Sequence, residues 1–364
     1  MNRKPLSAII CALLAAALFL PSCSKKYVME YKGHGITENM YHYWVSTYKR
    51  NILLSYSDAY DTAEFWGSEY SDGMTVKEYF DKSIRDRITD YLIAEVLFRE
   101  MRLSLDTSVK KAINDDISEK IEYYGGRKAL NGELANINLD VSTLKSIYTM
   151  EKKYAAVYEK LTGDGGAIAP TVDDVAAYYA ENYSRIKYIV FYTTALVTDE
   201  NGNQLYDDIG RPLTAELSET ELAEKEEKIA ECMRRAETGE DFSALAAEYS
   251  EYDTSAYKNG FFISFNEINT WGEQIISGAK DAGENDVFRV DEEYAVYVVV
   301  KLPLTPLGEL EDSDISQLSS LNTYVCREKA EEYFASLRPL VTVSEEALAA
   351  CSVSDVKTNP YYGF

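Results

Sequence analysis

Apolar residues recur at helical spacing through the first half of the chain. One stripe predicts a long amphipathic helix, because its members repeat every three to four positions: Val76, Phe80, Ile84, Ile88, Leu92 and Val96. Thr75 and Glu78 form a capping box at the start of this helix. A second stripe, between Val141 and Leu161, predicts another long helix. We therefore expect residues 37–162 to form a helical module, which a first strand within residues 23–36 precedes.

The pattern changes in the second half of the chain. A glycine-rich linker and then a capped helix are expected within residues 163–185. Two runs rich in β-branched and aromatic residues, Ile186–Leu196 and Ala295–Leu302, are typical of buried strands. Between these runs the spacing of apolar residues predicts a helix over residues 218–238. Helices in one part and mixed strands and helices in another predict an α+β fold.

The last part of the chain is expected to be helical again. Two prolines and an acidic loop follow the last predicted strand, and residues 307–340 contain a helical pattern. Residues 341–364 are expected to form a tail. We find no internal period that would predict a repeat array.

The first 22 residues have the pattern of a secretory signal. Arg3 and Lys4 precede an apolar run from Leu6 to Leu20, which is short for a membrane span. The following Leu20-Pro-Ser-Cys23 resembles the lipobox of bacterial lipoproteins, in which the cysteine carries the lipid anchor. Residues 1–22 are therefore expected to be a lipoprotein signal peptide and Cys23 the lipidation site. The alternative is an ordinary cleaved signal, and either reading places the chain outside the cytoplasm.

Composition excludes several classes of function. A formal charge of -24 argues against nucleic acid as a partner. This charge either attracts basic unfolded polypeptides or merely keeps the surface solvated. Cys232, Cys326 and Cys351 are odd in number and widely spaced, so they predict no disulfide framework. The two histidines, His34 and His42, have no cysteine or histidine partners at metal-binding spacing, so no metal site is expected.

The segment Gly239–Phe265 carries a resemblance to a known family. It predicts a helix, a turn and a returning strand around one acidic residue, Asp253. Its run Phe242-x-x-Leu-Ala-x-x-Tyr-Ser, followed by Asn259-Gly260, resembles the helical signature and glycine turn of the parvulin peptidyl-prolyl isomerases. The order of elements over residues 186–303 is similar as well. The resemblance implies a parvulin-like domain whose four-stranded antiparallel sheet is flanked by helices.

The same resemblance implies a set of catalytic positions. Asp253 precedes Gly260 at the family's spacing, where parvulins place a Cys or Asp that faces the substrate carbonyl. The family's two histidines are replaced here, and aligning the strands puts Tyr188 and Tyr297 in their positions, with a register uncertainty of one residue. Two phenols could hydrogen-bond to each other and keep the shape of the site. The alternative for Asp253 is a turn-capping aspartate.

The order of elements in the parvulin family also implies which residues contact a proline ring. They are Phe262, Phe265, Trp271 and Ile275, and the alternative for each is ordinary core packing. Rotation about an X-Pro bond requires no nucleophile, metal or cofactor, because a pocket that favours the twisted amide is sufficient. The uncatalysed barrier is about 18–20 kcal/mol.

Outside this domain, the element order resembles the PrsA and SurA families. Residues 27–185 and 307–340 are similar to their helical chaperone module, in which a helix after the isomerase domain packs on the N-terminal helices. The resemblance implies an extracytoplasmic foldase, anchored to the bacterial cell membrane as a lipoprotein, that binds unfolded secreted polypeptides and has weak peptidyl-prolyl isomerase activity. The alternative is a non-catalytic holdase or assembly factor that uses the parvulin-like domain as a scaffold.

Two other classes fit the sequence less well. A solute-binding lipoprotein would show strands and helices alternating in both halves of the chain, whereas the first half here has a helical pattern. A hydrolase would need a nucleophile paired with a histidine, and both histidines lie near the start of the chain. The sequence leaves open whether the chain forms a homodimer.

Overall fold

Two units make up the chain in the computed structural model, which describes residues 27–55, 60–71, 73–201 and 203–359. The first unit comprises Met1–Ala169 together with Lys329–Phe364, and the second comprises Pro170–Glu328. The second unit is therefore inserted into the chain of the first. The signal segment and Cys23 lie outside the described residues.

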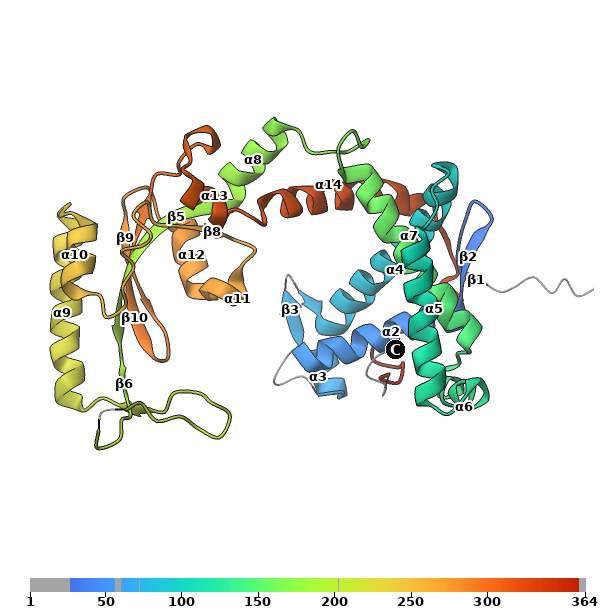
Figure 1. Cartoon of the computed structure of the whole chain (residues 1–364), viewed down its shortest axis with the longest axis horizontal. Coiled ribbons are helices and arrows are strands. Elements are labelled where there is room, and N and C mark those ends of the chain that lie inside the picture. Colours follow the sequence, from blue (N-terminus) through green and yellow to red (C-terminus); the bar gives the residue numbers. More distant parts are fainter. Residues whose placement is uncertain (1–26, 56–59, 72, 202, 360–364) are drawn as a thin grey trace, which may run out of the picture. The chain divides into compact units, whose positions relative to one another are not determined.

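Helix α4 (Val76–Glu100) is the central helix of the first unit (Figure 1). It begins at the capping box that the sequence predicts, with Thr75 and Glu78 bonded reciprocally. Its apolar stripe, including the fully buried Ile88 and Leu92, packs against α7 (Val141–Thr162). Helices α2 (Glu38–Ser55), α3 (Ala63–Gly67), α5 (Thr107–Tyr123) and α6 (Arg127–Leu134) belong to the same unit, and so does the short α15 (Glu345–Ala349) near the C-terminus.

A small antiparallel sheet joins the two ends of the first unit. It has the order β11-β1-β2, with bounds of Thr342–Val343, Tyr27–Tyr31 and His34–Thr37. Met29 pairs with Val343, so the pairing brings together residues that are very far apart in the sequence. A two-stranded hairpin, β3 (Glu69–Ser71) and β4 (Met74–Thr75), precedes α4.

The segment expected to be a tail is packed against the first unit as far as it is described. Cys351, Val353 and Val356 are buried in the core. The buried Lys49 of α2 donates a hydrogen bond to the carbonyl of Val356 at 2.9 Å and forms an ion pair with Asp61 at 2.7 Å. Residues 341–359 therefore contribute to the folded unit, because their apolar side chains fill its core.

The second unit is built on a four-stranded antiparallel sheet with the order β8-β5-β10-β9. The bounds are Tyr183–Tyr192 for β5, Phe261–Ser264 for β8, Val287–Asp291 for β9 and Ala295–Leu302 for β10. The α+β fold with a sheet of this kind is confirmed. The predicted strand Ile186–Leu196 begins earlier than expected and is divided, since β6 (Thr194–Leu196) pairs separately with β7 (Thr214–Glu216).

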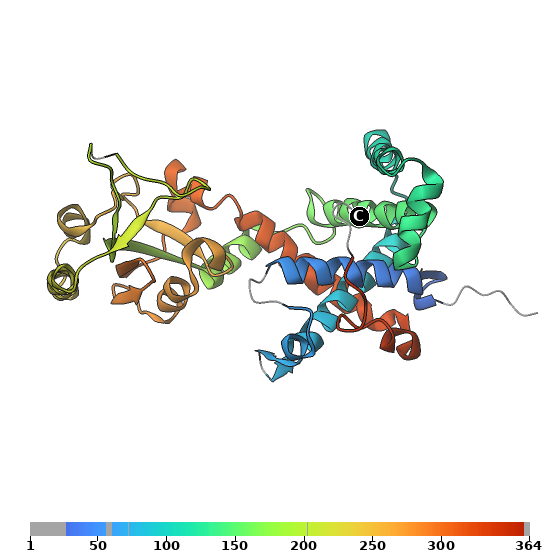
Figure 2. The same ribbon diagram turned by 90° about the horizontal axis from the view of Figure 1, so that it is seen from below.

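Helices cover both faces of this sheet (Figures 1 and 2). Alternate residues of β5 and β10, among them Ile189 and Val298, form one core with α9 (Glu219–Glu237) and α10 (Phe242–Tyr249). The other alternate residues, among them Ile186 and Val299, pack against α12 (Glu273–Asp281), which follows the short α11 (Ile268–Trp271). The period of two in each strand explains why both of its faces are apolar.

The helix predicted after the last strand is divided into two. Helix α13 (Asp312–Gln317) and helix α14 (Leu321–Leu337) are separated at Leu318, which is buried together with Leu321 and Val325 against Tyr178 of α8 (Val172–Asn182). The second half of α14 contributes Ala330 and Phe334 to the core of the first unit. Among the described residues, no helix has both the length and the apolar character that crossing a membrane requires.

Candidate functional site

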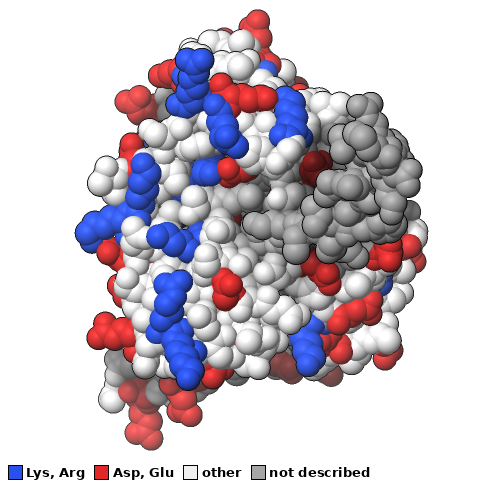
Figure 3. Space-filling model, turned by 90° about the vertical axis from the view of Figure 1, so that its right-hand side faces the viewer, with Lys and Arg blue, Asp and Glu red and all other residues white. Residues whose placement is uncertain are grey.

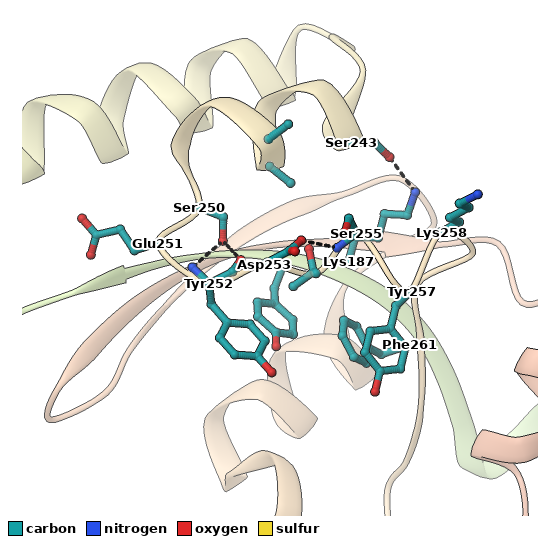
Figure 4. A pocket seen from close by; sticks show the side chains of 14 residues that line it. Lys187, Ser243, Ser250, Glu251, Tyr252, Asp253, Ser255, Tyr257, Lys258 and Phe261 are labelled. Carbon is teal, nitrogen blue, oxygen red and sulfur yellow. Dashed lines mark hydrogen bonds between the residues drawn. The ribbon is translucent and has the colours of Figure 1, made fainter. Parts of the chain in front are cut away.

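A hollow of about 620 Å³ lies at one edge of the sheet in the second unit (Figure 4). Strand β8 pairs only with the first half of β5, from Tyr183 to Ile186, and beyond that point residues 250–258 adjoin the edge instead. The hollow is lined by aromatic rings, small side chains and both signs of charge: Lys187, Tyr188, Ser243, Ala246, Ala247, Ser250, Glu251, Tyr252, Asp253, Thr254, Ser255, Tyr257, Lys258 and Phe261.

The segment that follows α10 is held at the edge of β5 by specific hydrogen bonds. The N–H of Val190 donates to the hydroxyl of Ser250 at 3.2 Å, and the N–H of Glu251 donates to the carbonyl of Val190 at 2.9 Å. The carboxylate of Glu251 accepts the N–H of Tyr192 at 2.7 Å. Through these bonds, residues 250–251, which are not in a strand, pair with the outer edge of β5. They therefore fix the position of the residues that follow.

Asp253 lies on the wall of the hollow and is exposed to solvent. Its carboxylate accepts the N–H of Ser255 at 2.8 Å, as in an Asx-turn (Figure 4). This backbone hydrogen bond lowers the pKa of Asp253 below its ordinary value, because it stabilises the charged form. The carboxylate is therefore ionised at neutral pH and acts only as a hydrogen-bond acceptor.

Tyr188 and Tyr297 lie on the same face of the sheet, on the neighbouring strands β5 and β10. Their rings meet edge to face, with centroids 5.6 Å apart, and no hydrogen bond joins their hydroxyls among the described residues. Burial raises the pKa of Tyr188 to about 12, so its hydroxyl is a neutral donor at physiological pH. The two phenols therefore contact each other through their rings, which differs from the hydrogen-bonded pair considered from the sequence.

Three further rings extend this aromatic cluster. Phe261 stacks on Tyr188 with centroids 5.1 Å apart and contacts Tyr257 at 4.2 Å. Trp271 lies edge-on to Phe261 at 5.4 Å and to Tyr188 at 6.5 Å. Tyr188, Tyr257 and Phe261 form an aromatic wall of the hollow, and Trp271 and Tyr297 pack against this wall from outside the lining. The ring of Tyr257 is 42% exposed.

The residues expected to contact a proline ring do not all lie together. Trp271 contacts the aromatic cluster, and Ile275 is buried beneath the same face of the sheet. Phe262 points to the opposite side of β8, where it packs with Tyr178, Leu318 and Val325. Phe265 follows the far end of β8, where its N–H donates to the carbonyl of Asn182 and Lys280 lies over its ring.

The structure brings two of the three expected catalytic residues to one hollow. Asp253 and Tyr188 both line it, and Tyr297 is connected to it only through its contact with Tyr188. Sequence reasoning missed Tyr257 and Phe261, which form the aromatic wall. The two adjacent phenylalanines Phe261-Phe262 indicate that an aromatic side chain lies near the hollow. The sequence cannot tell which of the two faces it, because that depends on the strand register.

Both signs of charge reach the hollow. Lys187 donates to the hydroxyl of Ser243 on α10 at 2.8 Å, and burial lowers its pKa. Over the residues that the structure describes, no three His, Cys, Asp or Glu side chains are grouped where they could hold a metal ion.

No protein-family model matches the sequence, and no curated protein matches it. Among solved structures, the chain is similar to the foldase protein PrsA from Streptococcus pneumoniae, with 16% identity, a TM-score of 0.28 and coverage of 78% of this chain and 93% of that one. It is also similar to PrsA from Bacillus subtilis, with 16% identity, a TM-score of 0.22 and coverage of 77% and 89%. A third similar structure is the peptidylprolyl isomerase PrsA from Bacillus anthracis, with 16% identity, a TM-score of 0.25 and coverage of 76% and 99%. Similarity at this level does not transfer an activity.

Proposed function

We propose that this protein is an extracytoplasmic foldase that binds unfolded polypeptide in the hollow of its second unit and weakly accelerates rotation about X-Pro bonds. The observation that carries the proposal is the aromatic wall of Tyr188, Tyr257 and Phe261 beside an ionised carboxylate, Asp253. Cys23, outside the described residues, anchors the chain to the membrane in this proposal. The polypeptide clients are secreted proteins that have yet to fold.

The lining of the hollow suits a proline-containing segment. Rings on one side and the small side chains of Ala246 and Ala247 on the other offer apolar contact to a client, and this contact removes water from the amide. Only contacts that are better in the twisted amide than in the planar one lower the barrier. Asp253 can accept a hydrogen bond from a client N–H and so hold the segment in place.

The test is a refolding assay limited by proline isomerisation, with the full chain and a matched pair of variants. Without a catalyst the slow phase takes tens to hundreds of seconds. We expect the protein to shorten this phase and Tyr257→Ala to reduce the acceleration roughly two- to tenfold, since one aromatic contact contributes about 0.5–1.5 kcal/mol. Tyr206→Ala is the control, because Tyr206 is also exposed, at 57%, and does not line the hollow.

In the same assay, Asp253→Asn and Asp253→Ala distinguish two roles of the carboxylate: its charge acting on the client and its hydrogen bond stabilising the turn. The asparagine retains an acceptor for the N–H of Ser255, whereas the alanine removes the turn as well. Equal loss in both variants is expected if the charge acts on the client. Loss in Asp253→Ala alone would assign the residue to the turn.

One observation favours a second candidate, a holdase without isomerase activity. Tyr188 and Tyr297 are packed ring against ring, and Tyr188 also contacts Phe261 and Trp271, so these side chains fill part of the space below the hollow. Suppression of client aggregation with an unchanged slow refolding phase would support this candidate. Failure to suppress aggregation and to change refolding would exclude both.

A further inference from the structure

The outer edge of β5 has a regular pattern of paired backbone groups. Its even-numbered residues turn their N–H and C=O groups away from β10: Ile186 pairs with Phe261 of β8, and Val190 bonds to Ser250 and Glu251. At the start of the strand, the carbonyl of Asn182 accepts the N–H of Phe265. The odd-numbered residues face β10, because backbone groups alternate between the two sides of a strand.

Tyr188 is the exception on this edge. It lies between Ile186 and Val190, so its N–H and C=O point in the same outward direction as theirs. Within the described part of the chain, no hydrogen bond reaches either group from that side. The edge of β5 therefore carries one unpaired donor and one unpaired acceptor at Tyr188.

These groups lie next to the hollow. Tyr188 lines it with Phe261 and Tyr257 on one side and the residues of α10 on the other. The neighbouring segment is fixed to β5 on both sides of Tyr188: Ser250 and Glu251 bond to Val190, and Phe261 pairs with Ile186. Unpaired backbone groups at a sheet edge are a template for another extended strand.

We infer that an extended segment of the client pairs with the backbone of Tyr188, as an additional piece of antiparallel strand held in the hollow. The inference rests on the proposed function and specifies its mode of binding. The N–H of Tyr188 donates to a client carbonyl, and the carbonyl of Tyr188 accepts the N–H of the same client residue.

The pairing sets a sequence preference in the client. The residue opposite Tyr188 must have an N–H, so it is not proline. Its side chain points to the same face as the ring of Tyr188, which favours a large apolar side chain against Phe261 and Tyr257. The adjoining residue points to the opposite side, toward Ala246 and Ala247, where a proline ring has room.

The test measures amide hydrogen exchange at single residues of the full chain, with the peptide acetyl-Ala-Ala-Phe-Pro-Ala-Lys-amide as the probe. In the free protein we expect the amide of Tyr188 to exchange at least roughly tenfold faster than those of Ile186 and Val190, because only the latter two are paired. Saturation with the peptide is expected to slow Tyr188 by a similar factor. A peptide with N-methyl-phenylalanine lacks the donor and is expected to bind roughly fivefold more weakly.

Two protein variants test the same bond from the other side. Tyr188→Ala and Tyr188→Pro both remove the ring, but only the proline removes the N–H, and proline is tolerated at an unpaired edge position. We expect Tyr188→Pro to bind the peptide roughly fivefold more weakly than Tyr188→Ala, with equal circular dichroism spectra. If Tyr188→Pro does not fold, the N-methyl peptide and the exchange data decide.

The outcomes separate this inference from the proposed function. Accelerated refolding without protection of the Tyr188 amide by the peptide would overturn the edge pairing and leave the foldase proposal intact. Protection of Tyr188 without any effect on refolding or aggregation would support the pairing and remove the foldase role. An amide of Tyr188 that is already slow in the free protein, or no peptide binding, would overturn the inference.

Discussion

Single residues decide where the hollow begins and ends. Gly260 has a φ of +90°, in the left-handed region, and it lies immediately before β8 at the point where this strand meets β5. A Cβ atom at this position would lie 2.5 Å from the carbonyl oxygen of Ile186. Only glycine therefore allows the chain to turn away from β5 here and leave the edge open at Tyr188.

Gly260→Ala is expected to destabilise the protein more than a matched glycine substitution. Gly239 also has a positive φ, of +85°, but no atom lies within 4 Å of an added Cβ. Gly239→Ala should cost about 1–2 kcal/mol for the left-handed conformation alone, and Gly260→Ala should cost about 1–3 kcal/mol more because the backbone must shift. Urea denaturation of the two variants measures the difference. If both variants lost the same amount of stability, the backbone near Ile186 would accommodate the added Cβ at position 260 without cost.

At the scale of elements, a buried ion pair fixes the end of α14 to α4. Arg338, which opens the 3-10 turn Arg338–Leu340, donates to both carboxylate oxygens of Asp90 at 2.9 and 2.8 Å and also binds Glu331 at 2.7 Å. The side chains of Arg338 and Asp90 are only 16% and 4% exposed. Burial raises the pKa of Asp90, and the guanidinium opposes this effect. The pair therefore joins the C-terminal end of α14 to α4, the central helix of the first unit.

Arg338→Met should destabilise the protein by about 3–5 kcal/mol, since it leaves the buried carboxylate of Asp90 without its partner. The control is Arg234→Met, because Arg234 pairs with Glu231 on the exposed surface of α9 and such a pair contributes about 0–1 kcal/mol. Urea denaturation again gives both values. Adding Asp90→Asn to Arg338→Met is expected to recover part of the loss, and a double variant no more stable than Arg338→Met would contradict this account.

At the scale of the whole molecule, each unit has its own apolar core or cores, and charged side chains are unevenly distributed over the surface (Figure 3). Among the described residues, the first unit has one large core, and the second has three smaller ones that include residues of its sheet. The net charge is -24, yet lysine and arginine side chains follow one another across the face drawn in Figure 3. Tyrosine is abundant, with 30 residues, and both units bury phenols, such as Tyr43 in the first and Tyr183 in the second.

These buried phenols predict a loss of stability at alkaline pH. Burial raises the pKa of Tyr43, Tyr91 and Tyr183 above the ordinary value near 10. The folded state keeps these protons when the unfolded state loses them, so the stabilisation is complete below pH 10 and is lost as the pH rises through the folded pKa. Each phenol should lower the free energy of unfolding by up to about 1.4 kcal/mol per pH unit above 10.

Unfolding in urea at a series of pH values from 8 to 12 measures this dependence. Tyr43→Phe removes one buried phenol and should make the alkaline slope shallower. Tyr206→Phe is the control, because it removes a phenol hydroxyl from a side chain that is 57% exposed. An identical slope in all three proteins would mean that the buried phenols are not responsible.

Much of the fold could be predicted because it depends on neighbours in the sequence. The capping boxes at Thr75 and Thr171 begin helices α4 and α8 as expected, since the bonds that form them span three residues. The apolar stripe of α4 and the continuous apolar run of β10 are likewise local patterns. The position of Asp253 beside the glycine turn could also be predicted, because Ser255 and Gly260 are close to it in the chain.

The sequence by itself therefore determined the types of the elements, the α+β class and the place of an acidic turn before a glycine. Only the tertiary structure decided that Phe261 and not Phe262 faces the hollow, and that residues 341–359 pack into the first unit. It also decided that the backbone of Tyr188 has no partner on its outward side within the described part of the chain. The reason is physical. Element type follows from contacts a few residues apart, whereas register, face and edge depend on pairings such as Met29 with Val343 that no local pattern records.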